Sequence, residues 1–249
     1  MQMIIEFIGD KEVVLPLEHN YLLQAAIYHQ IEQPAFRNFL HEQGFALGHR
    51  RFKLFVFSRL MGKFRMDEEK REIVFTPPCR LVICSPLSLF LENLVRSLLR
   101  QGRFYLGKNR LTVGSIKTRD TVVRQSPITV RMLSPLTVYS TFNDNGKPFT
   151  YYYSPFEPRF PELIKENLAK KYQLIFGRPA DPTDFSFTPV EVRERDFKVV
   201  RYKGTIIKGW MGKYRLTGDP QLLEVALSAG LGAKNSQGFG CCELVEEED

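Results

Sequence analysis

Apolar and polar residues alternate from residue 3 to residue 8, which is the pattern of a strand with one buried face. Residues 20–30 carry apolar side chains at helical spacing, and residues 34–44 predict a second, shorter helix. Two segments rich in aromatic and β-branched residues follow at 53–66 and 71–83, and the polar residues between them predict a hairpin turn. A strand, two helices and a hairpin are therefore expected in that order.

A leucine-rich stretch follows this hairpin. Leu recurs at helical spacing through residues 85–102, where we expect Ser88 to cap the helix and Gly102 to end it. Residues 103–119 then predict a pair of strands. The resulting order is that of a ferredoxin-like (RRM-like) βαββαβ unit, with one helix inserted after the first.

The second half of the chain repeats this order less clearly. A strand, a hairpin through an Asp-Asn-Gly turn, an amphipathic helix, more strand-forming residues, a helix and a last strand are predicted at 121–133, 141–154, 161–177, 190–218, 221–232 and 238–245. At 249 residues the chain exceeds one ordinary domain of roughly 100–150 residues. We therefore predict an α+β fold of two tandem ferredoxin-like βαββαβ domains, residues 1–120 and 121–249. No Gly/Ser-rich linker separates them, so we expect the domains to pack firmly together.

Apolar stretches and cysteines indicate the setting of the protein. The apolar stretches fall short of the roughly 20 residues that a membrane span needs, and the N-terminus lacks the basic region of a signal peptide. We expect a cytoplasmic protein with no membrane partner. The spacing of the four cysteines favours reduced structural thiols over a disulfide framework or a zinc site, so no metal or other cofactor is expected; they are Cys79, Cys84, Cys241 and Cys242.

Charge indicates a polyanionic partner. The formal net charge is +7, and without the five acids of the C-terminal ELVEEED the chain has 35 basic against 23 acidic residues. Residues 43–66 contain six Arg or Lys and no acid, and residues 100–124 contain seven against one. Clustered positive charge suits a polyphosphate chain, because each neutralised phosphate releases counterions. A solvated basic surface is the alternative, and charge alone does not decide between them.

The sequence GLGAKNSQGFG, residues 230–240, joins a predicted helix to the last predicted strand. Glycine permits positive φ and close approach to a ligand, while Lys, Asn and Ser offer donors to phosphate or sugar oxygens. The loop ends a helix rather than opening one, so nucleoside triphosphate binding is not expected. The alternative is a helix C-cap followed by a bulged strand. The residues predicted to bind RNA are Gly230, Gly232, Lys234, Asn235, Ser236, Gly238 and Gly240, together with Arg50 and Arg51 of the basic segment.

A helix followed by G-x-G-x-K-N-S-x-G-F-G resembles the signature of the repeat-associated RNA-binding (RAMP) superfamily, and specifically of the CRISPR RNA-processing endoribonucleases. The segments HNYLLQAAIYHQI, FLHEQGF and FKLFVFSRLMG resemble the first helix, the second helix and the following strand of that family. The resemblance implies two ferredoxin-like domains and metal-independent cleavage of CRISPR repeat transcripts by 2′-OH attack. It also implies 2′,3′-cyclic phosphate and 5′-OH ends, repeat RNA as partner, and mature guide RNAs for antiviral defence as products. Association with a CRISPR interference complex is left open.

Metal-free RNA cleavage needs a group at the 2′-OH, an acid at the leaving 5′-oxygen and a cation for the phosphorane charge. The resemblance assigns these roles to Tyr28, His41 and Lys53, respectively. The ordinary pKa of a tyrosine is about 10, so Tyr28 orients a hydroxyl more readily than it deprotonates one. Ordinary packing or surface positions are the alternative for all three residues.

Two further alternatives concern the site and the class of protein. His49 lies in a basic loop, is nearer Lys53 in sequence and could share or replace the role of His41. The segment between His41 and Lys53 is longer and more basic than the family pattern, so a different local geometry could displace Lys53. A noncatalytic RNA-binding scaffold subunit of the same superfamily is the alternative to an enzyme. A generic RRM-like binder would need aromatic side chains for base stacking, for which Tyr151, Tyr152 and Tyr153 are the candidates.

Overall fold

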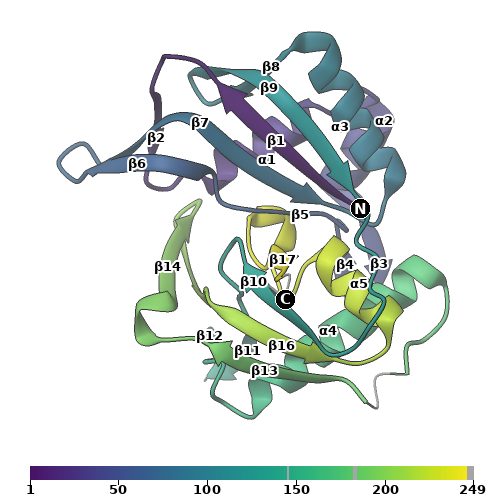
Figure 1. Cartoon of the computed structure of the whole chain (residues 1–249). Helices are drawn as coiled ribbons and strands as arrows, with labels where there is room; N and C mark the ends of the chain where they lie inside the picture. The colour runs from purple at the N-terminus through teal and green to yellow at the C-terminus, as the bar shows by residue number, and fades with distance from the viewer. Residues whose placement is uncertain (145, 182–183, 246–249) are drawn as a thin grey trace.

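Two sheet-and-helix units lie one above the other in the computed structural model, which describes residues 1–144, 146–181 and 184–245 (Figure 1). The first unit is built on an antiparallel sheet in the order β2-β7-β1-β9-β8, with β5 and β6 also paired to β7. Its strands are β1 (Gln2–Ile8), β2 (Val13–Pro16), β5 (Val56–Phe57), β6 (Met61–Asp67), β7 (Glu72–Cys84), β8 (Arg103–Leu106) and β9 (Asn109–Arg119). The short strands β3 (Phe45–Leu47) and β4 (Arg50–Phe52) pair only with each other.

The core of the first unit lies between its sheet and its helices. Met3, Ile5 and Phe7 alternate along β1 and are at most 1% exposed, which confirms the strand predicted from the alternating pattern. They share one cluster with Leu23 and Leu94, which lie on two of the helices. The helices are α1 (Asn20–His29), α2 (Pro34–Asn38) and α3 (Ser88–Gln101).

The second unit repeats this arrangement around a four-stranded antiparallel sheet in the order β13-β16-β10-β17. Its elements are β10 (Ile128–Met132), β11 (Tyr139–Asp144), β12 (Lys147–Tyr152), α4 (Arg159–Phe176), β13 (Ser186–Glu191), β14 (Phe197–Tyr202), β15 (Thr205–Trp210), β16 (Lys213–Thr217), α5 (Pro220–Ala229) and β17 (Cys242–Leu244). Two hairpins, β11–β12 and β14–β15, stand outside the sheet. Ile164 and Leu168 of α4 and Leu223 of α5 pack in one core with Val130 and Tyr214 of the sheet.

Both sheets have the strand order of a ferredoxin-like unit. In each, the first strand is central, with the third strand of the βαββαβ series on one side and the fourth on the other. The predicted α+β class with two tandem ferredoxin-like units is therefore confirmed. Residues 120–127 between the last strand of one sheet and the first strand of the other contain no helix or strand. The domain boundary at residue 120 stays a prediction.

Two predicted features of the first unit differ from the structure. The helix expected over residues 34–44 divides into α2 and a π-helical turn, η1 (Phe39–Gln43), because Gly44 N bonds to Phe39 O five residues earlier. Ser88 is not the cap of α3, because it is already helical; Leu87 holds the cap position without a side-chain bond. Gly102 does end α3, as predicted, and it takes the left-handed conformation that is common after a helix.

In the second unit the predicted elements are correct in type, but several of their bounds differ. Helix α4 begins at Arg159, two residues before the predicted helix, and β13 begins at Ser186, before the predicted strand region of 190–218. The strand expected over 121–133 is reduced to β10, and the last strand is reduced to β17. The helix expected over 221–232 ends at Ala229, because Gly230 leaves the helical region with φ +79°. The predicted hairpin over 141–154 is present as β11–β12, but Asn145 of its Asp-Asn-Gly turn lies outside the described residues.

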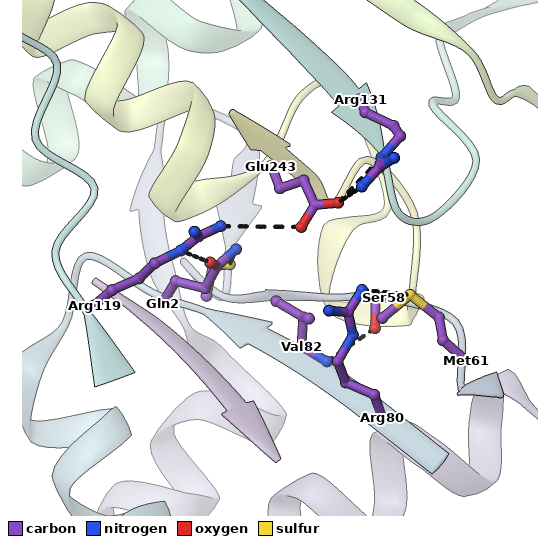
Figure 2. A network of polar contacts seen from close by, with 9 residues as sticks. Gln2, Ser58, Met61, Arg80, Val82, Arg119, Arg131 and Glu243 are labelled. Carbon is purple, nitrogen blue, oxygen red and sulfur yellow. Dashed lines mark hydrogen bonds and ion pairs between the residues drawn. The ribbon is translucent and has the colours of Figure 1, made fainter. Parts of the chain in front are cut away.

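The two units contact each other through an apolar cluster and an ion-pair network. Val56, Val82 and Cys84 of the first unit pack against Leu133 and Cys241 of the second. Figure 2 shows the polar contacts beside this cluster.

Glu243 of β17 is the centre of the part of this network that crosses between the units (Figure 2). Its carboxylate lies 3.9 Å from Nη2 of Arg119 in the first unit and 2.6 Å from Nη2 of Arg131 in the second. Arg119 also donates to Oε1 of Gln2 on β1. The Glu243 side chain is 11% exposed, so water screens these charges less than at an open surface.

In the part of the chain that is described, no helix combines the length and apolar character needed to cross a bilayer.

Candidate active site and glycine-rich loop

Tyr28 and His41 come together although they lie on different elements. Tyr28 is in the last turn of α1, and His41 is in the π-helical turn η1. Their ring centroids are 5.2 Å apart with the planes at 79°, an edge-to-face arrangement. Single π-helical turns occur frequently at functional sites, because the wider turn displaces a side chain from the regular helical positions. The structure therefore brings together two of the three residues predicted to be catalytic.

Lys53 completes the group by reaching back to the turn that carries His41. Its Nζ donates to the backbone oxygen of His41 at 2.7 Å. This approach requires glycine at position 44, where φ is +65° and a Cβ would lie 2.9 Å from the Lys53 side chain and 2.6 Å from Phe52 O. Partial burial lowers the pKa of Lys53, and the nearby Glu42 carboxylate opposes that shift.

The His41 imidazole is open to solvent and contacts a carboxylate. Its side chain is 61% exposed, and Nδ1 lies 2.5 Å from Oε1 of Glu42. A carboxylate at one ring nitrogen fixes the tautomer and the orientation of an imidazole, as it does in known acid–base sites. The other nitrogen, Nε2, is then the one suited to exchange a proton with a bound molecule.

Tyr28 is placed less favourably for proton transfer. The residue is 7% exposed, and its hydroxyl donates to Leu40 O at 3.4 Å. Burial raises the pKa of Tyr28 well above its ordinary value, and the electrostatic influence of Tyr202 and Glu42 adds to the shift. Because the phenolate is disfavoured, this hydroxyl is better suited to orienting a group than to removing its proton.

The glycines of the loop at 230–240 face the protein interior. Gly230, Gly232, Gly238 and Gly240 all have positive φ and are all buried. A Cβ at Gly232 would lie 2.5 Å from Thr137 O, and one at Gly240 would overlap Leu231 O. Packing and backbone conformation therefore explain these glycines without a ligand. Their contact with RNA stays a prediction, and the loop residues that keep partial exposure are Ala233, Lys234, Asn235, Ser236 and Gln237.

Lys171 of α4 binds the backbone of the loop, and it was not among the residues predicted from the sequence. Its Nζ donates to Gly230 O at 2.6 Å and to Gly232 O at 3.2 Å. The residue is only 1% exposed, and burial lowers its pKa to about 7, with the Cys242 thiol opposing the shift. A sequence signal existed, because Lys171 follows Ile164 and Leu168 at helical spacing on the apolar face of α4.

One cleft of about 670 Å³ is lined by Lys53 and by loop residues 232–237, whereas Tyr28 and His41 are not among its lining residues. The loop residues form one side of it, and the segment from Arg50 to Phe55 forms another. Lys234 Nζ lies 5.1 Å from the centroid of the Tyr139 ring, and burial lowers the pKa of Lys234. The basic side chains that line the cleft are Arg50, Arg51, Lys53, Lys171 and Lys234.

Of the remaining candidates, Arg50 and Arg51 line this cleft, whereas His49 and Tyr151–Tyr153 are not among its lining residues. Arg50 and Arg51 are exposed at the start of β4, and Arg51 Nη1 donates to Gln43 O at 3.4 Å. His49 is exposed in the turn between β3 and β4. The tyrosines considered for base stacking are already engaged in part, since Tyr151 donates to Glu157 and Tyr152 to Ile206 O.

The cysteines are thiols within the core. All four are free and buried. Among residues 1–144, 146–181 and 184–245, no three His, Cys, Asp or Glu side chains gather closely enough to hold a metal ion.

Comparisons with known proteins give the family. A family model described as "CRISPR associated protein Cas6, C-terminal" matches residues 117–244, and one described as "CRISPR-associated protein Cas6, N-terminal" matches residues 14–117. The "CRISPR-associated endoribonuclease Cas6 1" of Methanocaldococcus jannaschii is 28% identical over 256 residues, covering 100% of this chain and 94% of the relative.

Two solved structures resemble the whole chain. One described as "CRISPR associated protein Cas6" is 27% identical with a TM-score of 0.76, and the match covers 99% of both chains. One described as "An RAMP protein binding different RNA substrates" has a TM-score of 0.81 over 99% of this chain and 100% of that chain. At 19% identity the second supports the fold alone. The two family models together span residues 14–244, and the chain therefore belongs to the Cas6 family of CRISPR-associated proteins.

Proposed function

We propose that this chain is an endoribonuclease that cleaves CRISPR repeat transcripts without a metal ion and releases guide RNAs. The observation that carries the proposal is the hydrogen bond from Lys53 Nζ to the backbone oxygen of His41, beside a cleft that is also lined by Arg50, Arg51 and Lys234. The relative from M. jannaschii is named an endoribonuclease, and its match covers this chain from end to end. Repeat RNA is the partner that this combination of family and charge supports best.

The cleavage chemistry follows from the groups available. The 2′-OH of the substrate loses its proton to solvent water and its oxygen attacks the adjacent phosphate, so that the P–O5′ bond breaks. The leaving 5′-oxygen takes up a proton, and the products carry a 2′,3′-cyclic phosphate and a 5′-OH. Nε2 of His41 donates the proton that the leaving 5′-oxygen requires, while Glu42 holds Nδ1. Lys53 turns from His41 O to the phosphate and stabilises the charge of the phosphorane. Tyr28 orients the 2′-OH or the His41 ring, because its raised pKa makes it a poor base.

RNA binding is assigned to the cleft and the loop. Lys234, Arg50 and Arg51 provide positive charge to phosphates at the cleft walls. Asn235 and Ser236 expose part of their surface at the same cleft, while the glycines behind them give the loop its shape. Cytoplasmic location and association with an interference complex stay predictions.

The proposal is tested by incubating repeat RNA with the protein in excess EDTA. We expect cleavage to continue, with 2′,3′-cyclic phosphate ends on the upstream product. A substrate with a single 2′-deoxy residue at the scissile position is the matched control and should stay intact. RNA that is bound but never cut would instead support a noncatalytic scaffold subunit, and cleavage that EDTA abolishes would contradict the metal-free mechanism.

A further inference from the structure

Helix α1 of the first unit touches the glycine-rich loop of the second. Asn20, Gln24 and Tyr28 are spaced four residues apart, so they lie along one side of the helix. Asn20 Nδ2 donates to Gln237 O at 3.1 Å, and Gln24 Nε2 donates to Ser236 O at 2.6 Å. Tyr28, at the other end of the same side, contacts His41. One helix thus contacts both the loop that lines the cleft and the histidine proposed as the acid.

Gln24 makes a second contact that links a third element. Its Oε1 accepts a hydrogen bond from the hydroxyl of Tyr202, the last residue of β14. Tyr202 is 8% exposed and packs in a small cluster with Ile207 of β15 and Phe239 of the loop. The Gln24 amide therefore joins α1, the loop and the β14–β15 hairpin, using a donor for the loop and an acceptor for the hairpin.

The spacing along α1 gives this link a consequence for catalysis. With a rise of about 1.5 Å per residue, Gln24 and Tyr28 are separated by about 6 Å along the helix axis. A rigid helix keeps that separation constant while RNA binds. We propose that Gln24 is a positioning residue, which fixes the loop and the hairpin relative to His41 and so determines which phosphate of the bound RNA is cut. This inference rests on the proposed nuclease function.

The loop keeps its shape without Gln24. Lys171 holds Gly230 O and Gly232 O from within the second unit, and Asn235 Nδ2 donates to Leu231 O and Phe239 O. Loss of Gln24 therefore removes the bond from α1 to Ser236 O, while the bond from Asn20 to Gln237 O remains and the RNA-facing side chains stay in place. The expected defect is in the rate and position of cleavage, with affinity little changed, because misplacement of a reacting group by about 1 Å can cost about 10²-fold in rate.

Three variants separate the two links. Gln24→Met keeps the length of the side chain and removes both hydrogen bonds. Gln24→Glu can still accept from Tyr202 but cannot donate to Ser236 O, and Tyr202→Phe removes only the bond to the hairpin. Gln101→Met is the matched control. Gln101 also donates a side-chain hydrogen bond, to Oγ of Ser97, but both residues lie on α3, away from the loop.

The experiment measures single-turnover cleavage, the mapped cleavage position, the RNA dissociation constant and the melting temperature of each variant. We expect Gln24→Met and Gln24→Glu to slow cleavage by about 10-fold or more and to add cuts at neighbouring phosphates, whereas Gln101→Met behaves as wild type. Tyr202→Phe should show a smaller effect of the same kind. The dissociation constant should change by less than about 3-fold, which is under about 0.7 kcal/mol.

Several results would overturn the inference. These are an unchanged rate and cleavage position in both Gln24 variants, a loss of affinity with normal cleavage at saturating protein, or a rate that falls only in proportion to melting temperature. Wild-type protein that leaves repeat RNA uncut would overturn the proposed function and this inference with it. Normal wild-type cleavage with unaffected variants would overturn the inference alone.

Discussion

The glycine-rich loop and the segment from η1 to Lys53 differ in how firmly the protein holds them. The loop is fastened by Lys171, Asn235 and α1, and its glycines are buried. The other segment carries an exposed His41 on a π-helical turn, with Lys53 held by one hydrogen bond. Packing therefore explains the glycines of the recognisable motif, whereas His41, the group proposed as the acid, lies on a segment that is exposed to solvent.

Substitution inside the loop should have the largest effect on stability. Gly240→Ala places a Cβ against Leu231 O at φ +78°, so overlap adds to the left-handed strain and the free energy of unfolding should fall by about 3 kcal/mol. Gly204→Ala is the control, since φ is +82° and the Cβ meets nothing, so only about 1 kcal/mol should be lost. Denaturant unfolding measures both, and equal losses would show that packing around Gly240 is unimportant.

Removal of the Lys53 ammonium group should slow RNA cleavage without destabilising the fold. Lys53→Ala should slow cleavage by about 10²-fold, because a preorganised donor at the transition state is lost, with little change in unfolding free energy. Lys63→Ala, an exposed lysine on β6, should cleave at the wild-type rate. Single-turnover cleavage at saturating protein measures the rates of both variants and of wild type. If Lys53→Ala cleaves within 2-fold of the wild-type rate, a change on the order of 0.4 kcal/mol in activation free energy, then Lys53 does not stabilise the transition state.

The buried lysine beneath the loop should make stability depend on pH. Burial lowers the pKa of Lys171 to about 7 in the folded protein, while the unfolded chain has the ordinary value of about 10.4. Between these values the unfolded chain binds more protons, so the unfolding free energy contributed by this residue rises with pH, by at most about 1.4 kcal/mol per unit.

Denaturant unfolding of wild type and Lys171→Met at pH 6.5, 7.5 and 8.5 measures this effect. Wild type should gain stability relative to Lys171→Met as pH rises through about 7. Lys170→Met, at the neighbouring position of α4, should follow wild type at every pH. A difference between wild type and Lys171→Met that stays constant with pH would mean that the ammonium keeps its proton throughout.

The smallest effect is expected at Tyr28. Tyr28→Phe removes one long hydrogen bond to Leu40 O, so stability should fall by less than about 1 kcal/mol and cleavage by less than about 10-fold. A general base would cost about 10²–10⁴-fold instead. Cleavage rates of this variant at constant pH therefore separate an orienting role from proton abstraction.

The sequence predicted the layout of the fold better than the details of the site. Alternation at Met3, Ile5 and Phe7 and leucine spacing in α3 identified elements correctly, because burial determines both patterns. Ser88 was wrongly taken as a cap, since its suitability depends on where the first helical φ falls, which side-chain type does not determine.

Local sequence patterns did not predict the long-range contacts. The glycines suggested a backbone open to a ligand, whereas Thr137 O and Leu231 O occupy the space where side chains would be. The contact of Gln24 with Ser236 joins residues 212 positions apart, and no local pattern reports it. Tyr28, His41 and Lys53 were proposed from resemblance, and the structure brings them together without testing their roles.

Single-turnover cleavage of repeat RNA by wild type, His41→Ala and His49→Ala, with RNA affinity measured in parallel, tests the central claim most directly. We predict that His41→Ala slows cleavage by about 10²–10⁴-fold with affinity nearly unchanged, and that His49→Ala cleaves at close to the wild-type rate. Cleavage that depends on His49 and not on His41 would contradict the account.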